Sequence, residues 1–161
     1  MDIQINHDDK NNMHLLYKTL LESWNNQDAK KFANLFATDG NVIGFDGSQM
    51  NSRQQINDEL SKIFSEHQVA SYVGIVRDIR PLGSNVFLLS AVAGMVPPGK
   101  LAIKEDVNTI QTLIAQKGND QIMISLFQNT PAAYHGRPQL SKKLTEELQR
   151  VFDDHQIARE S

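Results

Sequence analysis

The sequence predicts one α+β domain, because its helical and extended segments occupy separate parts of the chain. Apolar residues recur with a helical period as far as Phe64, and from about Val69 the pattern changes to strands. Segregated runs of helices and strands are typical of α+β folds. The length of 161 residues suits a single domain over 1–161, and the 40% hydrophobic content excludes wholesale disorder.

Two helices are expected at the start of the chain. The first covers 8–25, with Asp8 or Asp9 as its N-cap. Asp28 caps a short second helix that carries Phe32 and Phe36 and ends at Asp39-Gly40. The apolar stripe of the first helix consists of Met13, Leu16, Tyr17, Leu20, Leu21 and Trp24.

A short strand and a third helix follow. Residues 42–45 are apolar and precede Asp46-Gly47, which is a turn signal. Ser52 and Gln55 have the spacing of a capping box, which predicts a helix start at this point. The apolar face of that helix comprises Ile56, Leu60, Ile63 and Phe64.

Four long strands are predicted in the second half of the chain, at 69–80, 84–96, 102–116 and 121–129. Short loops rich in Pro, Gly and Asn separate them, which favours an antiparallel meander. Pro138 then starts a last helix over 138–155, and 156–161 are expected to fray.

Composition excludes several classes of protein. The net charge of −3 lacks the basic excess of a nucleic-acid binder. The absence of Cys excludes a disulfide scaffold and a thiolate nucleophile. The first ten residues lack the pattern of a secretory signal, and no apolar stretch reaches the ~20 residues of a membrane span. We therefore expect a cytoplasmic protein without nucleic-acid or membrane partners.

Charge is sparse in the predicted sheet, where 69–136 hold only nine charged residues. An antiparallel sheet with one wet face is normally more polar on that side. We therefore expect both faces to be covered, one by the protein's own helices and the other by a second copy of the chain in a homodimer.

Two segments carry a resemblance to a known family. These are Trp24-Asn25-Asn26-Gln27-Asp28, followed by Leu35-Phe36-Ala37-Thr38-Asp39-Gly40, and Phe127-Gln128-Asn129-Thr130-Pro131, followed by His135-Gly136-Arg137-Pro138. With the order of elements, they resemble the nuclear-transport-factor-2-like superfamily, within it the SnoaL-like group, and most closely the SgcJ/EcaC family. The resemblance spans roughly 10–138.

That resemblance implies a curved, mainly antiparallel sheet wrapped around helices, a conical pocket and dimerisation through the sheet. The helix over 138–155 lies beyond the shared core. The superfamily includes isomerases, dehydratases, cyclases and non-catalytic binders, so the resemblance does not imply one reaction.

Asp46 and Asp78 are the candidate catalytic residues. Each lies beside apolar strand residues, and burial in an apolar cone raises the pKa of a carboxylate toward that of a general base. The alternatives are a turn residue for Asp46 and an ion pair with Arg77 or Arg80 for Asp78. The five His residues are scattered without ligand spacing, so neither a metal nor a cofactor is expected.

The candidate ligand-binding residues are aromatic or amide side chains. Trp24, Phe45 and Tyr72 form either core or pocket wall. Isolated amides within apolar strands orient ligands or satisfy backbone groups. The full set consists of Trp24, Phe45, Tyr72, Asn108 and Gln128.

We therefore expect a homodimeric protein that encloses a small, largely apolar molecule. One alternative is a cofactor-free isomerase, dehydratase or cyclase with a pocket carboxylate as base. Another is a protein-interaction module with a filled cone.

Overall fold

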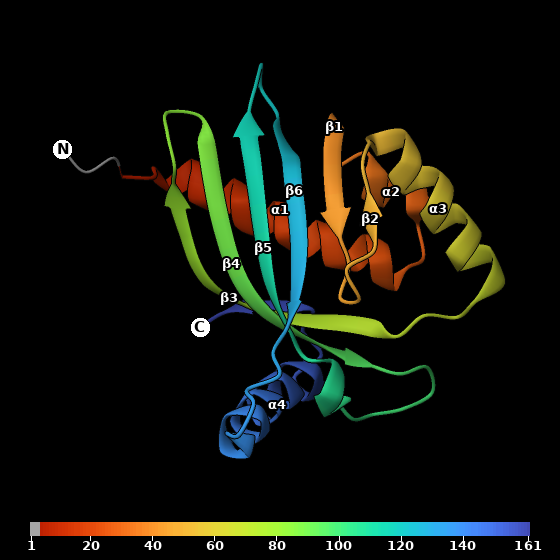
Figure 1. Cartoon of the computed structure of the whole chain (residues 1–161). Helices are drawn as coiled ribbons and strands as arrows, with labels where there is room; N and C mark the ends of the chain where they lie inside the picture. The colour runs from red at the N-terminus through yellow and green to blue at the C-terminus, as the bar shows by residue number, and fades with distance from the viewer. Residues whose placement is uncertain (1–3) are drawn as a thin grey trace.

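The computed structural model describes residues 4–161 and has the predicted α+β architecture (Figure 1). The main helices and three of the four long strands lie within a few residues of their predicted positions. The elements are α1 (His7–Asn25), α2 (Ala29–Ala33), β1 (Phe36–Ile43), β2 (Gln49–Met50), α3 (Arg53–Glu66), β3 (Ser71–Pro81), β4 (Val86–Val96), η1 (Glu105–Val107), β5 (Thr109–Lys117), β6 (Ile122–Pro131), α4 (Pro138–Asp153) and β7 (Ala158–Glu160).

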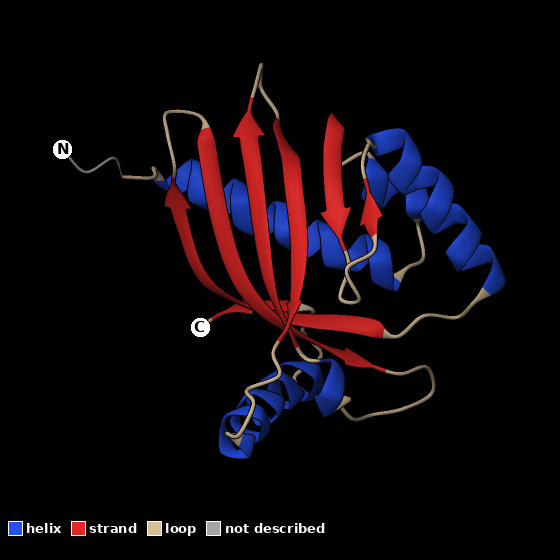
Figure 2. Cartoon of the chain, viewed as in Figure 1, coloured by secondary structure: helices blue, strands red, loops and turns tan. Residues whose placement is uncertain are grey.

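The strands form one curved sheet in the order β2-β1-β6-β5-β4-β3-β7 (Figure 2). The pairs β3–β4, β4–β5 and β5–β6 are antiparallel, which confirms the predicted meander. The strands β1 and β7 pair in parallel with β6 and β3. The helix α1 crosses one face of the sheet, called the inner face here, and α4 packs on the opposite, outer face (Figure 1).

The region around Phe36 differs from the prediction. The second helix ends at Ala33, and Phe36 begins β1 instead of closing that helix. Asp39-Gly40 therefore lies within a strand, at an irregularity of the pairing with β6 between Phe36 and Asn41. A Cβ on Gly40 would lie 2.7 Å from the Ile124 carbonyl oxygen, so this glycine permits a close approach of two strands.

Two other predictions also need correction. The third long strand begins at Thr109 rather than at residue 102, because 102–108 form a loop that contains η1. The last residues, expected to fray, include β7, whose register with β3 runs from Gly74 to Val76. The Ser161 N–H donates to the Val76 carbonyl and extends this ladder.

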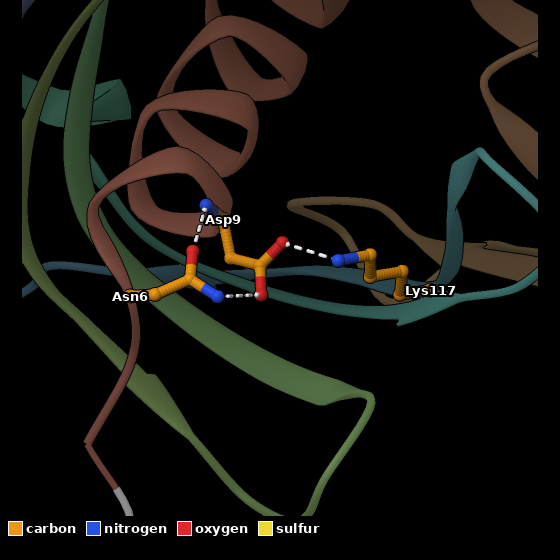
Figure 3. Close-up of polar contacts among 3 residues, drawn as sticks. All are labelled: Asn6, Asp9 and Lys117. Carbon is orange, nitrogen blue, oxygen red and sulfur yellow. Dashed lines mark hydrogen bonds and ion pairs between the residues drawn. The ribbon is translucent and has the colours of Figure 1, made fainter.

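The N-terminus of α1 has a different cap from the one predicted. The Asn6 side chain accepts from the Asp9 N–H at 2.8 Å, so Asn6 is the N-cap. The buried Asp9 carboxylate instead accepts from Lys117 Nζ and Asn6 Nδ2, both at 3.0 Å (Figure 3). Because Lys117 ends β5, this ion pair fastens the start of α1 to the sheet.

The sheet contributes to two apolar clusters. The larger one lies on the inner face, around Tyr17, Phe87 and Leu113. The smaller one lies between α4 and the outer face, around Ile75, Val92 and Leu148. The chain's own α4 therefore accounts for part of the low charge that led us to expect a partner on this face.

Candidate functional site

A cavity of about 360 Å³ opens between the helices, the β1–β2 hairpin and the inner face of the sheet. Its walls are contributed by α1, α2, α3 and five strands, so segments from Leu21 to Asn129 meet there only in the folded chain. The walls are mainly apolar. The aromatic residues are Trp24, Phe32, Phe45, Tyr72 and Phe127, and the polar side chains are Asp46, Ser48 and Asn129.

Trp24 anchors the aromatic wall at the end of α1. Its ring lies 5.3 Å from Phe64 and 5.5 Å from Tyr72, measured between centroids. Its indole N–H donates to the Ala70 carbonyl at 2.9 Å. The adjacent Asn25 side chain both donates to and accepts from the Tyr72 backbone, which holds the start of β3 against α1. The protein's own contacts thus hold these aromatic groups in place.

The mouth of the cavity lies at the turn between β1 and β2. Phe45, on that turn, and Ile63, on α3, are each 36% exposed. Gly47 adopts a φ of 90°, a conformation that the Asp-Gly turn requires. Asp46 Oδ1 accepts from the Ser48 N–H at 2.9 Å, and this hydrogen bond holds the pKa of Asp46 below its usual value. Asp46 is exposed, so the expectation that burial raises its pKa is wrong. It is the turn residue and an ionised group at the exposed side of the cavity lining.

A buried chain of hydrogen bonds lies behind the cavity. The Tyr17 hydroxyl donates to Gln111 Oε1 at 2.6 Å, and Gln111 Nε2 donates to Asn129 Oδ1 at 3.0 Å. Asn129 Nδ2 in turn donates to the Ile43 carbonyl at 3.3 Å. Burial, with a contribution from nearby Tyr72, raises the pKa of Tyr17 far above its usual value, and burial raises the pKa of Tyr72 to about 12. Both phenols are therefore protonated at neutral pH.

The structure brings four of the predicted residues to one place. Trp24, Phe45, Tyr72 and Asp46 all line the cavity. Asp78 and Gln128 belong to one cross-strand row with Ser90 and Thr112, on the outer face. Asp78 is exposed there, 3.9 Å from Arg80, which is the ion-pair alternative. Neither Asp78 nor Gln128 reaches the cavity.

Asn108 lies on the side of α4. Its side chain is 2% exposed and donates to Thr145 Oγ1 at 2.8 Å. It lines a separate hollow of about 400 Å³ beside the start of α4. The contact with Thr145 fits a residue that positions α4 rather than one that meets a ligand in the aromatic cavity.

Asn129 is a buried polar residue of the cavity that we did not select as a ligand contact. It is the neighbour of the selected Gln128, and adjacent strand residues point to opposite faces. Phe127 is buried in the inner cluster, so the alternation of faces places Asn129 beside it on the inner side. That alternation was the available signal, and it distinguishes the two amides.

No group of three His, Asp or Glu side chains that would suit a metal ion occurs within residues 4–161. Over the same residues, no helix is long and apolar enough to cross a membrane.

No protein-family model matches the sequence, and neither does any curated protein. Solved structures do match. A domain of unknown function with a cystatin-like fold from Nostoc punctiforme PCC 73102 has a TM-score of 0.76 and 19% identity, covering 93% of this chain and 95% of its own.

A second such protein of unknown function from that organism has a TM-score of 0.69 and 15% identity, over 82% of this chain and 98% of its own. A nuclear-transport-factor-2-like protein of unknown function from Shewanella oneidensis MR-1 has a TM-score of 0.59 and 13% identity, over 76% of this chain and 98% of its own. The chain has the cystatin-like, nuclear-transport-factor-2-like fold. In this chain the cavity lies between the inner face of the curved sheet and the helices beside it.

Proposed function

We propose that this protein binds a small, largely apolar molecule in the cavity beside Trp24. The observation that carries the proposal is the cavity itself, with about 360 Å³ of space, aromatic walls and few polar groups. Small-molecule sites have volumes of about 300–1,000 Å³ and combine apolar walls with a few placed polar groups. A filled cone would have favoured the interaction-module alternative.

Trp24 fluorescence provides the test, because Trp24 is the only Trp in the chain. We expect titration with a panel of aromatic and polyketide-like compounds to shift or quench its emission. Val42→Phe narrows the cavity, since Val42 lines it, and weakens binding. Val86→Phe makes the same change on β4 away from the cavity and serves as the control. An unchanged emission with the whole panel, or equal effects of the two variants, contradicts the proposal.

The electrostatics of Asp46 favour binding over proton abstraction. A general base works best when its pKa lies near the working pH. The hydrogen bonds from Ser48 instead lower the pKa of Asp46, so its carboxylate is a weak base. The cofactor-free isomerase, dehydratase or cyclase is therefore the second candidate. If the protein converts a bound compound, and Asp46→Asn loses this activity while Asp78→Asn retains it, the result would favour the enzyme.

The proposal includes a homodimer formed through the part of the outer face that α4 leaves uncovered. Leu88, Ile114 and Leu126 form a cross-strand row there, and each is only half-buried. Light scattering should give twice the chain mass of 18.1 kDa. Ile114→Glu should give monomers, whereas Leu15→Glu, on exposed α1 surface, should leave the dimer intact. A monomeric wild-type protein contradicts this part of the proposal.

We also propose that the chain belongs to the SnoaL-like proteins of the SgcJ/EcaC type. The support is the pair of segments at 24–28 and 127–131 together with the fold. Trp24 in the first segment and both Phe127 and Asn129 in the second line the cavity. Both motifs thus meet at the proposed binding site.

A further inference from the structure

We infer that the ligand of the cavity carries a neutral hydrogen-bond acceptor, such as a ketone oxygen, that Asn129 binds through its side-chain N–H. This inference rests on the proposed function and deepens it by naming the ligand's chemical class. It follows from the hydrogen bonds of the Asn129 amide with Gln111 and with the Ile43 carbonyl, which leave that amide one orientation.

Tyr17 lies at one end of this chain of hydrogen bonds. Its side chain is fully buried, and its hydroxyl keeps its proton because burial raises its pKa. The hydroxyl donates to Gln111 Oε1 at 2.6 Å. In this arrangement the oxygen of the Gln111 amide faces Tyr17 and its nitrogen faces Asn129. A phenol hydroxyl can also accept, so Tyr17 by itself does not fix the direction.

Ile43 determines the direction at the other end. Gln111 Nε2 donates to Asn129 Oδ1, and the Thr109 hydroxyl lies 3.5 Å from the same oxygen. Asn129 Nδ2 donates to the Ile43 backbone carbonyl, a group that can only accept. Turning the Asn129 amide over would set oxygen against this carbonyl and nitrogen against the Gln111 donor. The Ile43 carbonyl therefore fixes the orientation of the Asn129 amide, and the Tyr17–Gln111 hydrogen bond agrees with it.

The consequence is a preorganised donor in the cavity wall. The Asn129 amide nitrogen carries two hydrogens, and the Ile43 carbonyl takes one of them. No group among residues 4–161 accepts the second, and Asn129 lines the cavity. A ligand acceptor at this position pairs a largely buried N–H without any rearrangement of the protein.

Charge at the mouth distinguishes a neutral acceptor from an anion. Asp46 is ionised at neutral pH, and it is the single charged residue among those that line the cavity. Asp46 is exposed, so solvent screens its charge, but the lining has no Lys or Arg, and a carboxylate ligand would lose hydration there without gaining a counterion. A ketone meets no such penalty.

Three compounds of nearly equal shape test the inference by calorimetry: 2-acetylnaphthalene, 2-isopropenylnaphthalene and 2-naphthoate. One added neutral hydrogen bond corresponds to an affinity ratio of about three- to tenfold. We therefore expect the ketone to bind about three- to tenfold more tightly than the hydrocarbon, and the anion to bind more weakly than the ketone.

Adjacent amides on opposite faces provide matched variants. Asn129→Leu removes the donor, so the ketone and the hydrocarbon should bind equally. Gln128→Leu makes the corresponding change outside the cavity and should keep the preference. Tyr72 lines the cavity, so Tyr72→Phe is expected to alter the affinity for both compounds, but the ratio between them should persist because the inferred donor is Asn129 and not the Tyr72 hydroxyl. Circular dichroism establishes that each variant is folded.

The native chain offers a second measurement that does not depend on a variant. The side-chain amide signals of Asn129 in a ¹⁵N–¹H spectrum should shift with the ketone and much less with the hydrocarbon. Equal affinities of the two compounds for the wild-type protein, or a preference abolished by Tyr72→Phe instead, would overturn the inference while the proposed function stands. If neither compound binds, the proposed function fails and the inference fails with it.

Discussion

Tyr17→Phe is the substitution whose effect follows most directly from the structure. It removes one oxygen from a fully buried side chain and leaves the ring that fills the space against Gly74. Gln111 is also fully buried, so its Oε1 would lose a 2.6 Å hydrogen bond with no water to replace it. An orphaned buried acceptor costs about 1–3 kcal/mol. We expect the free energy of unfolding to fall by about 2 kcal/mol.

Urea denaturation followed by circular dichroism measures this change. The midpoint should fall while the slope stays constant, because the surface exposed on unfolding hardly changes. For a chain of this length, the melting temperature should fall by about 4–8 °C. Tyr134→Phe is the matched control, since Tyr134 is only half-buried in a loop. A loss below about 0.5 kcal/mol for Tyr17→Phe would refute our assignment of the buried chain.

Three further substitutions test other parts of the structure. Gly74→Ala would press a methyl group against the hydroxyl of the same tyrosine and should lower stability by about 1–3 kcal/mol in thermal unfolding, whereas Gly83→Ala, at an open site, should not. Hydrogen bonding lowers the folded-state pKa of Asp46 below its ordinary value of 3.8. The stability that the ionised carboxylate contributes is therefore present above pH 3.8 and is lost as the pH falls through the folded-state pKa. Asp46→Asn should therefore be less stable than wild type at neutral pH, with the gap closing in acid; a gap independent of pH would contradict the assignment. Lys117→Met removes the partner of the buried Asp9 carboxylate, and urea denaturation should show a loss of about 1 kcal/mol that shrinks at high salt.

Local patterns predicted the elements whose partners are near in sequence. The stripe from Met13 to Trp24 and the Ser52 cap marked α1 and α3, and the loop signals marked the β3–β6 meander. β1 was not predictable in the same way. Its start at Phe36 depends on a parallel pairing with β6, nearly 90 residues later in the chain. The local sequence around Phe36 contains no signal for that distant pairing.

The candidate site was predictable in its aromatic part. Trp24 and Tyr72 line the cavity because helical and strand periodicity bring them to the inner face. The amides were harder, because a strand boundary uncertain by one residue reverses which side chain faces inward. Gln128 and Asn129 differ by that single step. Asn108 lies just before β5, where strand alternation no longer applies, and its side chain turns to α4.

The two edge strands of the sheet have a consequence for aggregation through strand pairing. An open sheet edge is a template on which other chains can add strands and aggregate. Here one edge is β2, with only two residues, and the other is β7, with three. Beyond the reach of β7, the edge of β3 carries exposed Arg77, Asp78 and Arg80, a register shift and then Pro81, all of which discourage strand addition. The charge of Asp78 thus helps to keep the free edge of β3 from pairing with other strands. Removal of residues 157–161 would expose the apolar part of the β3 edge and should promote aggregation.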